Sequence, residues 1–410
     1  MKSFILSFFI VVTFSVSAQV RSLDYYIGQA IQSSPLFTEN KNQIESLKYD
    51  SMQIRALYKP QINFDNYNLY APIINGYGYD KAITNGGAIT TVIGANISFA
   101  GKKNLENQLQ KLHLQSQSLQ VSKKLTEKEL KRSITSQYIL VYGEQQILQK
   151  EEEVLKVLKK EEVILKRLAE EGTYRQTDYL YFLVNFKQQQ LLTEQKKLKI
   201  KNDLALLNCS CGIADTTEVI LEKPLLSKAN TLPLDQTLSF SQFIADSLIL
   251  KNTYEQFSFI SKPRLNIFGD AGYNSSLNYM AEKNFGASIG LHLVIPVYDG
   301  KQKNINREKI KLSENIRVSF LQFYKKQYSQ NTLRMQQQLS SISLLKENSR
   351  EQLALAEVLV KANEKLLMTG DAKIAEYIVA ITNYITAQGF IIQLENDELQ
   401  LISEYNYMNY

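Results

Sequence analysis

The sequence predicts an α+β membrane protein that combines long α-helical coiled-coil hairpins with four transmembrane β-strands per chain. Three observations lead to this prediction: a long proline-free stretch with apolar residues at heptad spacing, several segments in which apolar and polar residues alternate, and a repetition of both along the chain. Heptad spacing is typical of packed helices, and alternation is typical of strands with one apolar face.

The first 18 residues have the pattern of a secretory signal peptide. A lysine at position 2 precedes an apolar run from Phe4 to Phe14, and Val16-Ser17-Ala18 forms a small-residue cleavage site. The alternative is an uncleaved anchor, but the run is shorter than a bilayer requires. We therefore expect the mature protein to begin at Gln19, outside the cytoplasm. No later apolar run is long enough for a transmembrane helix, so the mature chain would enter a membrane as strands.

The stretch from Gly101 to Asn208 predicts a helical hairpin. It contains no proline, and Gly172 is its main break. At 1.5 Å per residue its arms would reach about 100 Å and about 50 Å. We expect the heptad residues to pack in helix interfaces. In the first arm they are Leu105, Leu112, Leu119, Ile134, Val141, Leu148, Leu155, Leu158 and Leu165, and in the second arm Val184, Leu191, Leu198 and Ala205.

Four segments of about ten residues predict strands, the length that a tilted membrane-spanning strand needs. Alternation is regular in residues 285–298, 264–274 and 93–99, and less regular in 62–70. A small soluble sheet with one buried face would show the same alternation. Four strands cannot close a barrel, and lipid does not tolerate an open sheet edge. A membrane location would therefore require several chains, each contributing four strands.

The chain repeats itself at an offset of about 200 residues, which indicates a tandem duplication. Lys59-Pro60 recurs as Lys262-Pro263, and Gly101 recurs as Gly300. Gly172 with Asp178 recurs as Gly370 with Glu376. The predicted divisions are a signal peptide (1–18), a first repeat (19–212) with its tip at Gly172, a linker (213–237), and a second repeat (238–410) with its tip at Gly370. The helix before the second pair of strands, residues 239–261, looks shorter than its counterpart, residues 23–58.

The composition and motifs argue against an enzyme and against a nucleic-acid-binding protein. The 47 basic and 41 acidic residues are nearly balanced, and no phosphate-binding loop or hydrolase signature is present. Cys209 and Cys211 are too close for an unstrained disulfide, and the two histidines, His113 and His292, lie far from them in sequence. We predict no catalytic residues, no metal site and no cofactor, and a purely structural role for both cysteines.

Taken together, the mature chain resembles the TolC-type outer-membrane efflux proteins. The resemblance rests on the twofold repeat, the Lys-Pro entry into each first strand, the joints at Gly101 and Gly300, and the tip sequences that begin at Gly172 and Gly370. It implies a homotrimer with a twelve-stranded barrel in the outer-membrane lipid and an α-helical tunnel across the periplasm. It further implies a periplasmic adaptor and an inner-membrane transporter as partners, for passive export of small molecules or proteins.

The resemblance also implies roles for residues at the tips. Glu376, Asp371 and Asp178 would surround the periplasmic aperture, and Gly172, Thr173, Gly370 and Asp371 would contact the adaptor. The family's tip arginine and second acid are replaced here by Ala372 and Val379, which leaves the usual ion-pair network incomplete. Close carboxylates from several chains would favour cations, whereas the other interpretation of Glu376 is an ordinary solvated residue.

Two other protein classes remain open at this point. A secreted or periplasmic coiled-coil scaffold or adhesin would combine such helices with a small soluble sheet. A periplasmic adaptor also carries a helical hairpin, although only once, so the duplication disfavours it. The nature of the exported cargo is not indicated by the sequence.

Overall fold

The computed structural model describes residues 19–80, 86–99, 101–215, 217–276, 280–369 and 371–409, with the backbone alone at Gln19 and Ile260. The predicted signal peptide lies outside these residues. The chain divides into two compact units, one formed by Met1–Pro35, Thr126–Leu232 and Gln327–Tyr410, the other by Leu36–Leu125 and Pro233–Lys326. Both predicted repeats contribute to each unit, because the two longest helices, α4 (Lys102–Glu170) and α7 (Gln302–Thr369), have residues in both.

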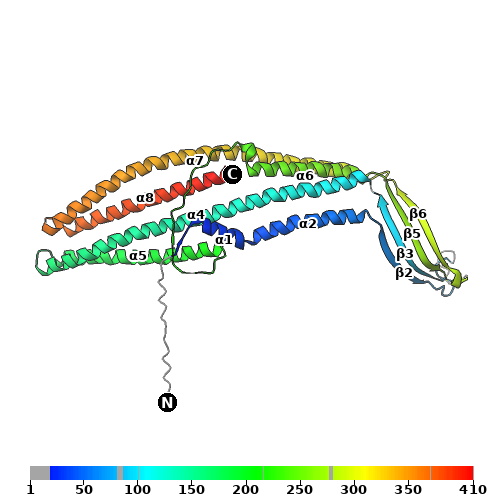
Figure 1. Ribbon diagram of the computed structural model, residues 1–410, viewed down its shortest axis with the longest axis horizontal. Coiled ribbons are helices and arrows are strands. Elements are labelled where there is room, and N and C mark those ends of the chain that lie inside the picture. The colour runs from blue at the N-terminus through cyan, green and yellow to red at the C-terminus, as the bar shows by residue number, and fades with distance from the viewer. Residues whose placement is uncertain are drawn as a thin grey trace, which may run out of the picture. The chain divides into compact units, whose positions relative to one another are not determined.

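The second unit contains one four-stranded sheet, whose strands lie side by side in Figure 1. All neighbours are antiparallel, in the order β2-β3-β5-β6. The strands are β2 (Gln61–Tyr70), β3 (Gly87–Phe99), β5 (Arg264–Ser275) and β6 (Phe285–Val294). The two predicted repeats thus pair with each other through β3 and β5, and the four predicted strands are confirmed. β6 ends earlier than its alternation suggests, because Pro296 has no N–H to donate to a ladder.

Helices α2 (Pro35–Leu57) and α6 (Leu238–Ile260) precede the first strand of each pair. The expectation of one continuous helix from Leu23 to Tyr58 is wrong, because α1 (Leu23–Ser33) ends before Pro35. Proline disfavours helical geometry in the residue before it, and Ser34 is extended, with φ −70° and ψ 123°. The expectation that the helix before the second pair of strands is shorter than its counterpart is also wrong, since α2 and α6 each have 23 residues.

The first unit holds the two glycine-turn hairpins and a small parallel sheet. The hairpins are formed by α4 with α5 (Gln176–Ser210) and by α7 with α8 (Ile374–Met408). The small sheet pairs β1 (Gln19–Arg21) with β4 (Val219–Leu221), which lies in the predicted linker. One apolar cluster covers this sheet and the other fills the space between the hairpins near their tips. The cluster at the small sheet consists of Tyr26, Ala30, Ile134, Tyr138, Val141, Leu204, Leu207, Cys211, Val219 and Leu221. The cluster between the hairpins consists of Val154, Leu158, Leu165, Phe182, Phe186, Leu367, Ile374, Tyr377, Ile378 and Ile381.

The heptad residues of α5 do not pack as expected within one chain. Val184, Leu191 and Leu198 are 68%, 54% and 71% exposed, whereas Phe182 and Phe186 are buried. The buried residues of α5 belong to a different face of the helix, so the heptad residues form an exposed apolar stripe.

Among the described helices, α8 is long and apolar enough, by length and composition alone, to cross a bilayer. This corrects the expectation that no such segment follows the signal peptide. Several of its residues belong to the cluster between the hairpins, including Tyr377 and Ile381, so a packing role accounts for their apolar character.

Both cysteines are free, as expected from their spacing. Cys211 is buried in the cluster around β1 and β4, and burial raises its thiol pKa to about 12. Such a thiol is a poor nucleophile and a poor metal ligand, because both roles require the thiolate. Its position in the cluster agrees with the structural role predicted for it.

Candidate functional site

The two faces of the four-stranded sheet differ in chemistry. Cross-strand pairing places β2, β3, β5 and β6 residues in common rows, such as Ile97, Ile267 and Leu291. One face is mainly apolar and carries no charge, and its polar members are Asn66, Asn68, Thr91 and Ser275. Its members include Ile62, Phe64, Ile93, Ala95, Ile97, Phe99, Leu265, Ile267, Ala271, Phe285, Ala287, Ile289, Leu291 and Leu293. Several are far from buried, and Ile289 is 86% exposed. A single chain therefore presents a sheet-wide apolar surface.

The opposite face carries the charged residues of the sheet and most of its polar residues. Asp65 and Asp270 lie on β2 and β5, and Ser288 donates a hydrogen bond of 2.7 Å to the Asp270 carboxylate. Asn96 and Ser98 of β3 lie on the same face. Alternation between an apolar and a polar face is the pattern of a barrel strand with one side to lipid and the other to water.

The sheet has two edges, formed by β2 and β6. The outward backbone groups of an edge strand have no partner in the ladder, and in lipid each would cost several kcal/mol. Within one chain, no single environment satisfies both the apolar face and these edges. Lipid would cover the face, but only further strands would satisfy the edges.

The first hairpin tip, between α4 and α5, is closed by a glycine turn. Gly172 adopts the left-handed conformation, with φ +80°. The Thr173 N–H donates to the Leu168 carbonyl at 2.9 Å, and the Tyr174 N–H donates to the same oxygen at 3.3 Å. These bonds satisfy carbonyl groups that the end of a helix leaves free. Gly172 therefore ends the helix, as the sequence predicted.

The second tip, between α7 and α8, has two backbone hydrogen bonds that correspond to those of the first. The Asp371 N–H donates to the Leu366 carbonyl at 2.9 Å, and the Ala372 N–H donates to it at 3.2 Å. Gly370, the predicted counterpart of Gly172, lies outside the described residues. Glu376 is in the first turn of α8, as Asp178 is in the first turn of α5, and carboxylates there interact favourably with the helix dipole.

Tyr174 joins the two tips. Its hydroxyl donates to the Leu367 carbonyl at 2.9 Å and lies 3.0 Å from the Ala372 carbonyl. Burial raises the pKa of Tyr174, and the nearby charges of Asp371 and Asp178 raise it further. The structure thus brings Asp178 and Asp371 to one side chain, whereas Glu376 is exposed and takes no part in this contact.

Sequence reasoning did not assign Tyr174 a role. The sequence contains one signal that could have revealed it, a difference between the two repeats. Tyr174 stands two residues after Gly172, whereas Ala372 stands two residues after Gly370. A second omission is Glu161 of α4, which is only 4% exposed. Leu158 and Leu165, three residues before and four residues after it, belong to the cluster between the hairpins, so Glu161 lies on the same helix face.

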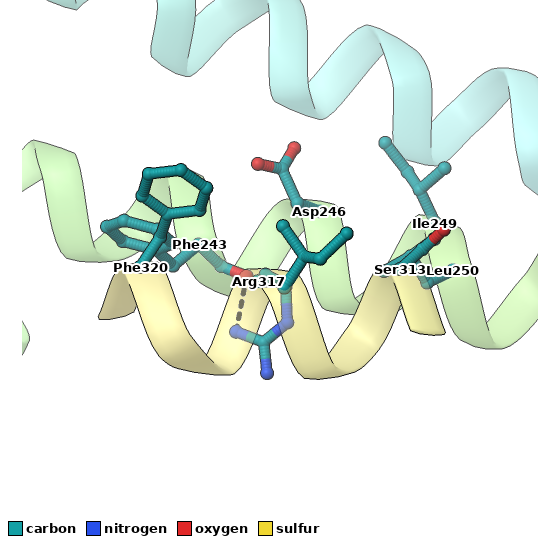
Figure 2. A pocket seen from close by; sticks show the side chains of 8 residues that line it. Phe243, Asp246, Ile249, Leu250, Ser313, Arg317 and Phe320 are labelled. Carbon is teal, nitrogen blue, oxygen red and sulfur yellow. Dashed lines mark hydrogen bonds between the residues drawn. The ribbon is translucent and has the colours of Figure 1, made fainter. Parts of the chain in front are cut away.

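An open groove of about 510 Å³ lies between α6 and α7 in the second unit. Figure 2 shows Phe243 and Phe320 at one end and Ile249 at the other. Arg317 donates to the Phe243 carbonyl at 3.2 Å and pairs with Glu314 at 2.6 Å. Its charge is therefore paired within α7, while its hydrogen bond to Phe243 links α7 to α6. None of the predicted tip residues lines this groove.

In the described part of the chain, no group of three or more histidine, cysteine, aspartate or glutamate side chains is placed to hold a metal ion. The arrangement presents two chemically distinct sheet faces, unsatisfied sheet edges, and paired helical tips that carry acidic side chains.

The fold is similar to that of several solved outer-membrane proteins. VceC from Vibrio cholerae has a TM-score of 0.77 at 12% identity, over 94% of this chain and 96% of that one. The CmeC outer membrane channel of Campylobacter jejuni has a TM-score of 0.77 at 10% identity, over 94% and 85% of the two chains. For the MtrE outer membrane channel of Neisseria gonorrhoeae the score is 0.73 at 10% identity, over 94% and 88%.

At the level of sequence, no protein-family model matches the chain and no curated protein matches it significantly. The structural likeness nevertheless covers nearly the whole described chain, including the long helices and the four antiparallel strands. The fold expected from the sequence resemblance is therefore confirmed: this chain has the fold of solved outer-membrane channels.

Proposed function

We propose that the protein is a subunit of an outer-membrane channel that exports molecules passively from the periplasm. The observation that carries this proposal is the four-stranded sheet with one exposed apolar face, one polar face and two open edges. Lipid fits the apolar face, and water in a pore fits the polar face. The open edges demand closure by strands of other copies, because lipid cannot satisfy them.

Three copies would supply twelve strands, the number implied by the resemblance to TolC-type proteins. The exposed stripe of Val184, Leu191 and Leu198 on α5 supports assembly of the helices as well. A helix side that is apolar and solvent-exposed in one chain is a surface for packing against another chain. Neighbouring copies in a closed helical wall would cover it, and the wall would enclose the passage through the periplasm.

The partners are proposed on the same basis. A periplasmic adaptor would contact the tips at Gly172, Thr173, Gly370 and Asp371, and an inner-membrane transporter would supply the energy. Asp178, Asp371 and Glu376 would face the aperture of the assembled tunnel. The contact of Tyr174 with Leu367 and Ala372 supports a tip that is held together in the absence of partners.

We further propose that the chain arose by duplication, with repeats at 19–212 and 238–410 joined by the linker 213–237. The equal lengths of α5 and α8, 35 residues each, support this origin. So do the matching hydrogen bonds at the two tips.

Membrane extraction separates the channel from a secreted scaffold or adhesin. A scaffold with a soluble sheet should leave isolated membranes in carbonate or high salt. A channel should remain in the membrane until detergent is added, and should then conduct ions when reconstituted in a planar bilayer. Release without detergent would contradict the proposed function.

A further inference from the structure

The tip region contains a carboxyl group in an unusual place. Glu161 of α4 is 4% exposed and lies on the face that carries Leu158 and Leu165. An isolated ionised carboxylate in such surroundings is strongly disfavoured unless it is paired, and it tends to take up a proton instead. Among the described residues, none forms an ion pair with Glu161, although fifteen such pairs occur elsewhere in the chain.

The groups that face Glu161 come from two other helices. Glu364 of α7 interacts with it electrostatically, and both carboxyl groups act on Tyr377 of α8. Tyr377 is fully buried, and its hydroxyl has no hydrogen-bond partner in the described structure. On α5, Tyr179 packs against the same cluster, and its hydroxyl donates to Glu162 at 2.9 Å and not to Glu161.

Among the described residues, no cation offsets the charge of Glu161. Lys361 of α7 pairs with Glu357 at 2.7 Å. The buried Glu161 thus lies on a helix face of the apolar cluster, where it is subject to the charge of the half-buried Glu364 and lies near the buried Tyr377. The described residues offer no set of three side chains that would hold a metal ion there. A proton is the ligand that removes the charge of Glu161, and with it the repulsion from Glu364.

We propose that Glu161 binds a proton when the hairpins are packed together, and that loss of this proton loosens the packing of α4, α7 and α8 near the tips. Because the tips form the aperture only in the proposed channel, the consequence for gating rests on the proposed function. In that setting, acidification of the periplasm would hold the passage shut and neutral or alkaline conditions would make it easier to open.

The direction of the pH effect follows from the surroundings of Glu161. Burial raises its pKa, and the charge of Glu364 raises it further. A group whose pKa is higher in the folded state than in the unfolded chain stabilises the fold as the pH falls. The stabilisation is complete below the ordinary glutamate pKa of about 4.3 and is lost as the pH rises through the elevated value.

The test is thermal unfolding of the intact protein in detergent between pH 5 and pH 8, for the native protein and for Glu161→Gln. The native protein should show a higher Tm at pH 5. Glutamine mimics the protonated acid, so Glu161→Gln should raise the Tm at pH 8 by on the order of 2 °C and flatten the pH dependence. Glu162→Gln is the matched control, since glutamine can still accept the bond from Tyr179. It should behave as the native protein does.

Hydrogen exchange of peptides covering Glu161, Glu364 and Tyr377 locates the effect. The same pH dependence in Glu161→Gln and in the native protein would overturn the proposal. Loss of the pH dependence on addition of EDTA would also overturn it, because a bound cation would then be responsible. If Glu161→Gln fails to fold, Glu364→Gln is used in its place. This variant should shift the pH at which the Tm decreases to a lower value. Absence of conductance in every variant would contradict the channel instead, since unfolding and exchange do not depend on a pore.

Discussion

Tyr174 shows how a single side chain can couple two tips that lie far apart in sequence. Its hydroxyl reaches carbonyl groups 193 and 198 residues further along the chain. Both carbonyls lie where α7 ends and the turn into α8 begins, a place where backbone oxygens lack partners within the helix. In the second repeat, Ala372 stands at the corresponding position and cannot make a reciprocal bond. Of these two positions, only Tyr174 makes a side-chain hydrogen bond between the tips.

Replacing Tyr174 with phenylalanine should weaken this coupling. The change removes one hydroxyl and keeps the ring, so the expected loss is about 1 kcal/mol, the usual net value of a hydrogen bond. Amide exchange in peptides around Leu367 should accelerate about fivefold. Tyr181→Phe is the control, because the Tyr181 side chain is exposed on α5, the helix that follows the tip. Equal exchange in the two variants would argue against the coupling.

At the scale of elements, the sheet depends on close approach between β3 and β5. A Cβ atom at Gly272 would lie 2.2 Å from the Thr91 carbonyl oxygen, which is a backbone atom and cannot turn away. Gly286 is the cross-strand partner of Gly272 on β6, and a Cβ atom there would meet nothing within 4 Å. The same substitution at these two neighbours should thus have very different consequences.

Gly272→Ala should displace β5 from β3 and reduce the yield of folded protein in the membrane fraction. Gly286→Ala should leave the yield close to that of the native protein, because its site is open. The comparison is made by quantifying each variant after detergent extraction. A normal yield of Gly272→Ala would show that the close approach of the two strands is not required.

The assignment of the two sheet faces leads to a second prediction about elements. Ile289 lies near the middle of β6 on the apolar face, and Asn96 lies on the polar face of β3. Arginine at a lipid-facing position near the bilayer centre costs about 2 to 4 kcal/mol. Ile289→Arg should therefore impair insertion, while Asn96→Arg should be tolerated. Equal insertion of both variants, measured as the fraction retained by carbonate-washed membranes, would contradict the assignment.

The sequence was sufficient to predict the long helices, the four strands and the tip glycine, because each depends on a local pattern. Heptads, alternation and a glycine at a helix end act over a few residues. The break before Pro35 was also encoded locally and was overlooked. The packing face of α5 could not be predicted in the same way. Phe182 and Val184 are both apolar, and only contact with other helices decides which of them is buried.

The tip contacts were the least predictable part. The acidic residues Asp178 and Asp371 were singled out from the sequence. Their common effect on Tyr174 was not predicted, because the two residues belong to different hairpins. The burial of Glu161 likewise depends on α7 and α8. Because its neighbours in the sequence are charged, the local pattern did not indicate that it is buried. Contacts between segments that lie far apart in the chain follow from tertiary structure, which one sequence without homologues does not specify.

At the scale of the whole molecule, one chain is chemically incomplete. Its sheet exposes an apolar face and two open edges, and α5 exposes an apolar stripe. Each of these features would be satisfied if several copies closed a common barrel in lipid and a common wall of helices below it. This requirement, which follows from the exposed surfaces, agrees with the fold shared with solved outer-membrane channels.

The most direct test is the mass of the particle that mild detergent extracts from isolated outer membranes. The 410-residue chain has a mass of 47.0 kDa with the predicted signal peptide included. We expect a stable particle close to three chains without that peptide, after the detergent contribution is subtracted. Such a particle would support closure of one barrel by twelve strands. A monomer, or a protein released without detergent, would contradict the proposal that the chain forms a shared barrel in the membrane.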